Sequence, residues 1–387
     1  MRMASFGTDG MPAPTQNKSG NNQVCRIVSD LAPQPVSPLD LLVALLAEGA
    51  DSGLANDPGT WAVIKKHAPR HGVAQLVAFT ARSRVPPAER AWCDQILTRS
   101  WARHNRNLLH LERCLGILQS AGIRALALKG PPVALRHYAP PFLRKPSTDI
   151  DLAVRNEDLE RSCEVFGRVG YTPVQTLPDA RARSHHIALT HPSEPPLELH
   201  FRLSHGAYGV PVDEFFTRAV TYKLPGGTEA PVLASADEIF HLVLHRAHGR
   251  FATLFHLLEI RRLWAAASPQ VRAETMHRAV EHHFTGAFLM TDIAFQTHWG
   301  ERFLADGDLP KTWLHNRISQ KLYKEFEALS DPGRELPLSA RLGRRWIDFQ
   351  LTDRPADARK FAGIMLRIAW YQLWERGWRT VRVGVAP

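Results

Sequence analysis

Apolar residues divide the chain into regions, because their spacing changes along it. Between residues 37 and 121 they recur every three or four positions, a spacing that predicts amphipathic helices. Pro38 suits the first helical position after a capping Ser37, and the longest helix should run from Pro87 to Ser120, with Gly122 as its stop. Residues 37–121 are therefore predicted to form an all-helical lobe.

From residue 122 to residue 232 the helical pattern gives way to short apolar runs. These runs are bounded by Gly or Pro and are too short for stable helices, so they predict buried strands. Helices are expected between them, one starting at Pro131 and one capped by Asn156. The predicted fold class is α+β, a small mixed β-sheet backed by helices and flanked by N- and C-terminal helical lobes. The predicted strands cover residues 123–128, 148–154, 171–175, 186–190 and 197–203.

The two ends of the chain differ from this centre. Residues 233–387 return to helical spacing, and a capping box of Ser235 and Glu238 should open this C-terminal lobe. Within it, residues 331–337 should be a connector, and Phe361 to Trp374 have the spacing of an amphipathic helix rather than a membrane span. Residues 1–36 offer too little apolar surface to offset the entropy of ordering, so a disordered arm is predicted.

Composition bears on the compartment and the ligand. The 387 residues are 44% apolar, as in ordinary soluble proteins. Four cysteines without a CxxC pair suit a reducing cytoplasm, and no segment resembles a signal peptide or a membrane span, so a soluble cytoplasmic protein is expected. The net charge of +10 fits a polyanion, whether nucleic acid, a triphosphate or an acidic peptide, and equally a basic surface that serves solubility.

The segment Asp149-Ile150-Asp151-Leu152 carries the first candidate chemistry. Side chains alternate faces along a strand, so Asp149 and Asp151 should point the same way while Ile150 and Leu152 point into the core. Two adjacent carboxylates repel each other, and oxygen-rich sites of this kind suit Mg²⁺ or Mn²⁺. The alternative is an exposed strand end with two solvated acids.

A second strand offers a third carboxylate. In residues 196–203 the alternation places Glu198, His200 and Arg202 on the polar face. If this strand pairs beside the Asp149 strand, Glu198 joins the acidic pair in a site for two metal ions. Without that pairing, Glu198 is a surface acid on a half-buried strand.

The turn Leu128-Lys129-Gly130 is a candidate phosphate site. Gly130 would let a phosphate approach the backbone, the first amides of the following helix would be donors at the positive end of its dipole, and Lys129 would add a charge. Many ordinary turns also use glycine at such a place. Further phosphate candidates lie just ahead of the acidic pair, at Arg144, Lys145, Ser147 and Thr148.

Together these segments resemble the uncharacterised nucleotidyltransferase family of the polymerase-beta-like nucleotidyltransferase superfamily. The resemblance spans about residues 105–265 and implies a nucleotidyltransferase palm over residues 122–232, with Asp149, Asp151 and Glu198 as the catalytic metal carboxylates. It is carried by Leu128-Lys129-Gly130, Tyr138, Arg144, Asp149-Ile150-Asp151-Leu152, Gly170-Tyr171 and Glu198-Leu199-His200-Phe201-Arg202-Leu203.

The resemblance implies transfer of a nucleoside monophosphate from a nucleoside triphosphate, with ATP as the first to test, to an acceptor hydroxyl, with Mg²⁺ or Mn²⁺ as cofactor. The acceptor is left open among a small molecule, a peptide and a protein, with nucleic acid less favoured. The wider superfamily has Gly-Ser or Gly-Gly at the turn, whereas Lys129-Gly130-Pro131 lacks the serine. The alternative function is therefore a palm without turnover that binds a peptide, a protein or RNA.

Histidines after the sheet are a weaker signal. His241, His245 and His248 share one face of the predicted helix, where histidines at a helix interface are the simpler explanation. His245 is kept as a ligand-binding candidate because the resembling family carries a histidine-bearing helix there. Glu259 on the next helix is predicted to lie on a solvated face, and His185-His186 are assigned a role at a turn edge.

Overall fold

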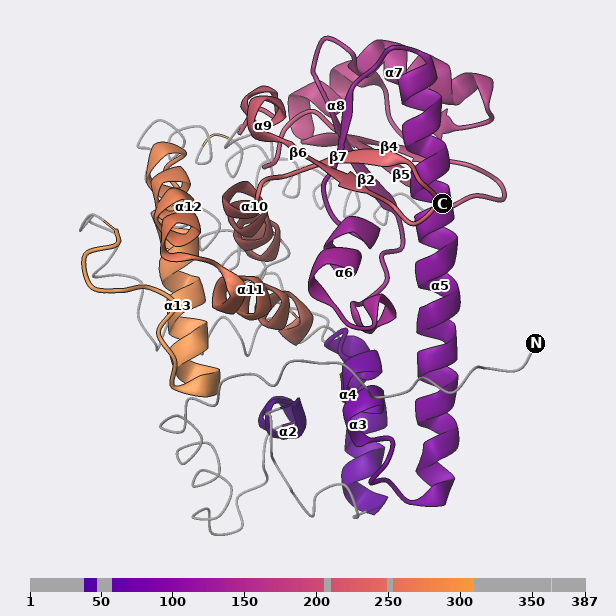
Figure 1. Cartoon of the computed structure of the whole chain (residues 1–387). Helices are drawn as coiled ribbons and strands as arrows, with labels where there is room; N and C mark the ends of the chain where they lie inside the picture. The colour runs from indigo at the N-terminus through magenta and orange to yellow at the C-terminus, as the bar shows by residue number, and fades with distance from the viewer. Residues whose placement is uncertain (1–37, 47–57, 205–209, 249–252, 310–362, 364–387) are drawn as a thin grey trace, which may run out of the picture.

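The computed structural model describes residues 38–46, 58–204, 210–248, 253–309 and 363. The predicted arm, the predicted connector and the Phe361 to Trp374 segment, apart from residue 363, lie outside this part of the chain. Figure 1 shows the sheet in the upper part of the view, with helices beside and below it.

Helices precede the sheet, as the spacing predicts. Residue Pro87 occupies the first turn of the longest of them, where backbone N–H groups have no partner within the helix. Gly122, just beyond its end, has a φ of +68°, a conformation that favours glycine. The predicted bounds of this helix are confirmed. The described helices of this region are α2 (Pro38–Leu46), α3 (Pro58–Arg70), α4 (Ala74–Ala81) and α5 (Pro87–Ser120).

The described strands form one seven-stranded mixed sheet. Strand β2 pairs parallel with β5 on one side and antiparallel with β1 on the other. The predicted α+β class is confirmed by this sheet and the helices around it. In spatial order the strands are β3 (Thr172–Pro173), β4 (His186–Thr190), β5 (Leu197–His200), β2 (Ile150–Val154), β1 (Ala125–Ala127), β7 (Glu229–Val232) and β6 (Val220–Lys223).

The sheet is covered by helices on both faces. Leu126 and Ala153 belong to a core shared with the C-terminal helices, whereas their neighbours Ala125 and Leu152 belong to a core shared with α5 and α7. Asp151 lies on the same side of β2 as Ala153, which is the side of the core shared with the C-terminal helices. The remaining helices are α6 (Pro131–His137), α7 (Leu159–Arg168), α8 (Leu177–Arg183), α9 (Asp213–Arg218), α10 (Ser235–His248), α11 (Leu254–Ala266), α12 (Pro269–Glu281) and α13 (Thr285–Trp299), with a 3-10 turn η2 at Pro141–Leu143.

One predicted helix start is wrong, and at another helix the predicted start at Ser235 is confirmed but the predicted cap is not. Asn156 does not cap α7, because the helix begins at Leu159 with Asp158 before it. The Ser235 capping box does not form either: the Glu238 backbone N–H donates to the Ala234 carbonyl. The Glu238 carboxylate instead binds α6, through Arg136 and His137, and so fastens α10 to the helix that follows the Lys129-Gly130 turn.

Strands β6 and β7 are not predicted from the sequence. β6 and β7 lie in a region for which no strand is predicted, and β6 is largely exposed, so it lacks the alternation that marks a half-buried strand. Pro231 within β7 weakens the signal further, since proline cannot donate to a β-ladder. Pairing with β1 on one side and β6 on the other places β7 in the sheet.

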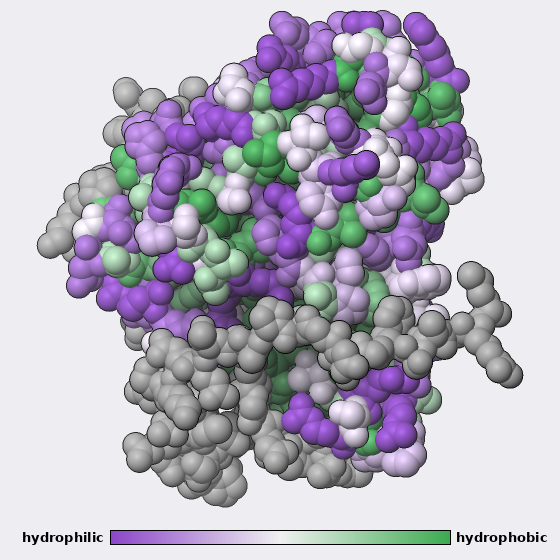
Figure 2. Space-filling view, in the orientation of Figure 1, coloured by the Kyte–Doolittle hydropathy of each residue, from purple (hydrophilic) through white to green (hydrophobic). Residues whose placement is uncertain are grey.

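The surface of the described chain mixes hydrophilic and hydrophobic residues. On the face in Figure 2, hydrophilic and hydrophobic residues are interspersed, with hydrophilic residues predominating at the upper end. The large apolar side chains that are exposed come from several separate elements. Among the described helices, none combines the length and the apolar character needed to cross a bilayer.

Candidate metal and nucleotide site

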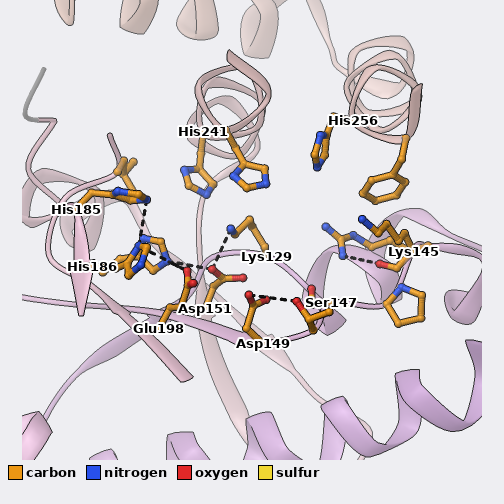
Figure 3. A pocket seen from close by; sticks show the side chains of 17 residues that line it. Lys129, Lys145, Ser147, Asp149, Asp151, His185, His186, Glu198, His241 and His256 are labelled. Carbon is orange, nitrogen blue, oxygen red and sulfur yellow. Dashed lines mark hydrogen bonds and ion pairs between the residues drawn. The ribbon is translucent and has the colours of Figure 1, made fainter. Parts of the chain in front are cut away.

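Two neighbouring strands bring the predicted carboxylates together. β2 and β5 run parallel in a register that sets Asp151 beside Glu198, which confirms the strand pairing on which the prediction depends. Potential ligand atoms of Asp151, Glu198 and His200 all lie within 4.8 Å of one another. Asp149, one residue before β2, lines the same cavity, as Figure 3 shows.

Asp151 is the buried centre of the acidic group. Its Oδ1 lies 2.9 Å from Lys129 Nζ and 3.0 Å from His200 Nε2. Burial by itself opposes ionisation, but the charges and hydrogen bonds of Lys129 and His200 outweigh it and hold the pKa of Asp151 well below its usual range. Asp151 is therefore a carboxylate at neutral pH.

The pKa of Asp149 shifts in the opposite direction to that of Asp151. Burial first, and then the neighbouring charges of Asp151 and Glu198, raise the pKa of Asp149 to about 6. The three acids carry more negative charge than Lys129 and His200 can balance. Asp149 is therefore the acid whose ionised form is disfavoured. This donor set of carboxylate oxygens fits a divalent cation such as Mg²⁺ or Mn²⁺, whose charge would favour the ionised form of Asp149.

His200 is a member of this group that the sequence analysis did not single out. Its Nε2 lies between Asp151 Oδ1 and Glu198 Oε2, at 3.0 and 3.3 Å. Burial disfavours the imidazolium, yet the two hydrogen bonds raise the pKa of His200 above its ordinary value. The signal was present in the sequence, because His200 stands two residues after Glu198 and therefore shares its face of the strand.

The Lys129-Gly130 turn differs in part from the prediction. Gly130 has a φ of +76° and precedes α6, but it does not line the cavity. Most of the first amides of α6 cannot donate to a phosphate, because Pro131 and Pro132 have no N–H and the Ala134 N–H donates to the Gly130 carbonyl. Lys129 does face the cavity, with its ammonium group paired to Asp151 (Figure 3).

Arg144 is held by an acid for which a solvated position was predicted. Glu259 is completely buried, so that prediction is wrong: Glu259 and Phe255 of α11 contact Arg144 in the loop that leads into β2. Arg144 Nε and Nη2 lie 2.5 and 3.2 Å from the two Glu259 carboxylate oxygens. Although burial opposes its charge, Glu259 keeps the pKa of Arg144 raised. Arg144 lines the cavity, but its guanidinium is committed to Glu259.

The loop after Arg144 borders the cavity. Asn107 of α5 donates to the Ser147 carbonyl at 2.8 Å, which anchors the loop to the long helix. The Thr148 hydroxyl donates to Asp149 Oδ2 at 3.4 Å. Lys145 stands with its ammonium group over the Phe255 ring and remains exposed. These residues, with Lys129, supply the positive and hydroxyl-bearing side of the site.

The cavity has a volume of about 430 Å³ and an unusual number of histidines. Burial lowers the pKa of His245 well below its ordinary value, so this predicted candidate is neutral at physiological pH. Burial likewise lowers the pKa of His256 to about 3 and that of His186 to about 4. In Figure 3, His241 and His256 occupy the wall opposite the carboxylates. The lining histidines are His185, His186, His200, His241, His245 and His256.

Comparison with known proteins gives a family match and two structural neighbours of low similarity. Residues 57–293 match the family described as "Uncharacterised nucleotidyltransferase". One similar solved structure is the antibiotic-resistance factor ANT(2'')-Ia, at 12% identity and a TM-score of 0.34, covering 46% of this chain and 96% of that one. Another is an antigenic nucleotidyltransferase-like protein from Paracoccidioides brasiliensis, at 11% identity and a TM-score of 0.29, covering 46% of this chain and 88% of that one. No curated protein matches the chain.

Proposed function

The chain belongs to the uncharacterised nucleotidyltransferase family, and we propose that it transfers a nucleoside monophosphate from a nucleoside triphosphate to an acceptor hydroxyl with Mg²⁺ or Mn²⁺. The observation that carries this proposal is the β2–β5 register, which sets Asp151 beside Glu198 with Asp149 in the same cavity. ATP is the first nucleotide to test.

In the proposed reaction the acceptor oxygen attacks the α-phosphorus, a new oxygen–phosphorus bond forms, and pyrophosphate leaves. Asp149, Asp151 and Glu198 would hold the divalent cations, which neutralise the charge that develops on the phosphate oxygens. Glu198 is the most exposed acid of the Asp151–Glu198–His200 group, with 23% of its side chain accessible, and would also accept the acceptor's proton. His200 orients Glu198 and Asp151 through its Nε2.

Positive groups on the other side of the cavity would hold the triphosphate. Lys129 and Lys145 bring charge, and Ser147 and Thr148 bring hydroxyl groups. Arg144 acts indirectly, because its pairing with Glu259 fixes the start of this loop. His245, neutral and cavity-facing, would contact the nucleotide as a hydrogen-bonding group.

One observation favours a second function. Lys129 Nζ lies 2.9 Å from Asp151 Oδ1. Its charge could therefore balance the buried carboxylate in a palm that binds no metal ion. On that basis the alternative is a palm without turnover that binds a peptide, a protein or RNA. The acceptor of an active enzyme would be a small molecule, a peptide or a protein. The free cysteines among the described residues suit a cytoplasmic location.

Transfer of label separates the two functions. The protein is incubated with each α-labelled nucleoside triphosphate, Mg²⁺ or Mn²⁺, and a cell extract as the source of acceptors. We expect label on an acceptor with the native protein and with Glu157→Gln, a control acid just after β2 whose side chain is 74% exposed. Asp149→Asn should lose the transfer. Absence of label with all four nucleotides would favour the binding module.

A further inference from the structure

Three histidines from two adjacent strands meet beside the carboxylates. His186 and His200 are direct cross-strand partners in the β4–β5 pairing, so their side chains share a face of the sheet. His185 comes just before β4, and its carbonyl accepts the backbone N–H groups of Phe201 and Arg202. These two hydrogen bonds tie His185 to the end of β5, beside His200.

The separations of these rings suit a shared cation. One ring nitrogen of each histidine lies within 4.8 Å of the others, and His186 Nδ1 lies 3.2 Å from His185 Nε2. The ring centroids are 4.4 to 5.2 Å apart. Zinc–nitrogen bonds of about 2.0–2.1 Å in a tetrahedron keep neighbouring ligand atoms roughly 3.3 Å apart. Small ring rotations would therefore bring three nitrogens onto one ion.

His200 has the hydrogen-bond pattern of a metal-binding histidine. Only 2% of its side chain is exposed, and its Nε2 is held by Asp151 and Glu198. Its Nδ1 is buried and has no hydrogen-bond partner among the described residues. Metal-ligating histidines usually give one ring nitrogen to the ion and the other to a carboxylate, and a buried nitrogen without any partner is costly.

The open cavity and the nitrogen ligands indicate which class of ion could bind the three histidines. All three histidines line the cavity, which gives an ion a path from solvent. Imidazole nitrogen suits borderline transition ions, whereas Mg²⁺ strongly prefers oxygen. Asp151 and Glu198 lie next to the histidines and would offset the charge of the ion.

We propose that His185, His186 and His200 form a separate binding site for a divalent transition ion of the zinc class. The ion joins the start of β4 to the end of β5 and fixes the ring of His200, on whose other nitrogen the two carboxylates depend. This site does not rest on nucleotidyl transfer: it shares His200 with the acidic group, but its other two ligands and its class of ion are different.

Cobalt titration tests the site without any activity measurement. Protein without a histidine tag is stripped with a chelator and titrated with Co²⁺, whose visible absorption is strong in tetrahedral and weak in octahedral coordination. We expect one equivalent of strongly absorbing Co²⁺, displaced by Zn²⁺ but not by excess Mg²⁺. His186→Gln and His185→Gln should each weaken binding at least about tenfold, since even groups that only support ligands cost that much. His277→Gln, whose ring is 69% exposed, should bind as the native protein does.

Two controls separate loss of this ion from unfolding and from loss of nucleotidyl transfer. Circular dichroism of the metal-free variants checks that they fold, and one equivalent of Zn²⁺ should raise the unfolding temperature of the native protein but not that of His185→Gln. Asp149→Asn should keep the Co²⁺ spectrum even if it abolishes transfer. Weak octahedral absorption in the native protein, or unchanged Co²⁺ affinity in both histidine variants, overturns the proposal.

Discussion

Replacing Glu259 by glutamine should destabilise the protein strongly, because Arg144 would keep a buried charge without a counter-charge. The side chains of Arg144 and Glu259 are only 5% and 1% exposed, and two hydrogen bonds join them. Breaking a buried ion pair by removing one partner costs about 3–5 kcal/mol. Gln retains one acceptor oxygen, so we expect Glu259→Gln to cost about 3 kcal/mol, at the lower end of that range.

A matched variant on the same helix separates burial from the mere loss of an ion pair. Arg261 of α11 makes a two-pronged pair with Glu301, and these side chains are 38% and 45% exposed. Glu301→Gln should therefore cost less than about 1 kcal/mol. The double variant Arg144→Met with Glu259→Met, which removes both buried charges, should recover most of the loss.

Urea denaturation of the purified proteins measures these differences in the free energy of unfolding. Equal losses of stability for Glu259→Gln and Glu301→Gln would refute the reasoning. A double variant that is less stable than Glu259→Gln would refute it as well. In that case the Arg144–Glu259 pair would be reached by water, and Arg144 would again be a candidate for direct phosphate contact.

Three further predictions concern the acidic site and the turn beside it. Because the pKa of Asp149 is raised to about 6, protons compete with the cation, and Mg²⁺ affinity measured by calorimetry should fall about tenfold per pH unit below pH 6 and level off above it; a flat profile would contradict this. Lys129→Met removes the cation paired with Asp151, so calorimetry should show tighter Mg²⁺ binding and weaker ATP binding, whereas parallel changes would count against competition for Asp151. Gly130→Ala should cost about 1–3 kcal/mol in urea denaturation because its φ is +76°, while Gly116→Ala, with open space around it in α5, should be neutral or stabilising.

The sequence predicts the parts of the palm that follow a regular period. β2 and β5 are recognisable because their buried side chains alternate with the acids, and α5 is marked by a proline at its start and a glycine beyond its end. The register that sets Asp151 beside Glu198 required a resemblance, since alternation fixes a face but not a neighbour. The domain boundaries at residues 37, 122 and 233 stay a prediction.

Long-range pairing explains what the sequence could not reveal. Arg144 and Glu259 are 115 positions apart, so neither a phosphate role for one nor a solvated face for the other could be tested before folding. His186 and His200 meet only through the β4–β5 register. The double proline of α6 is different: its missing N–H groups were readable from the sequence and already argue against phosphate binding by that helix end.

Calorimetry of ATP binding tests the central claim most directly, because it asks whether the three acids act through a cation. We expect the native protein and Asp306→Asn, a control whose side chain is 98% exposed, to bind ATP only when Mg²⁺ or Mn²⁺ is present. The double variant Asp149→Asn with Asp151→Asn should show no metal-dependent binding. Undiminished Mg²⁺-dependent ATP binding by that folded double variant would contradict the account.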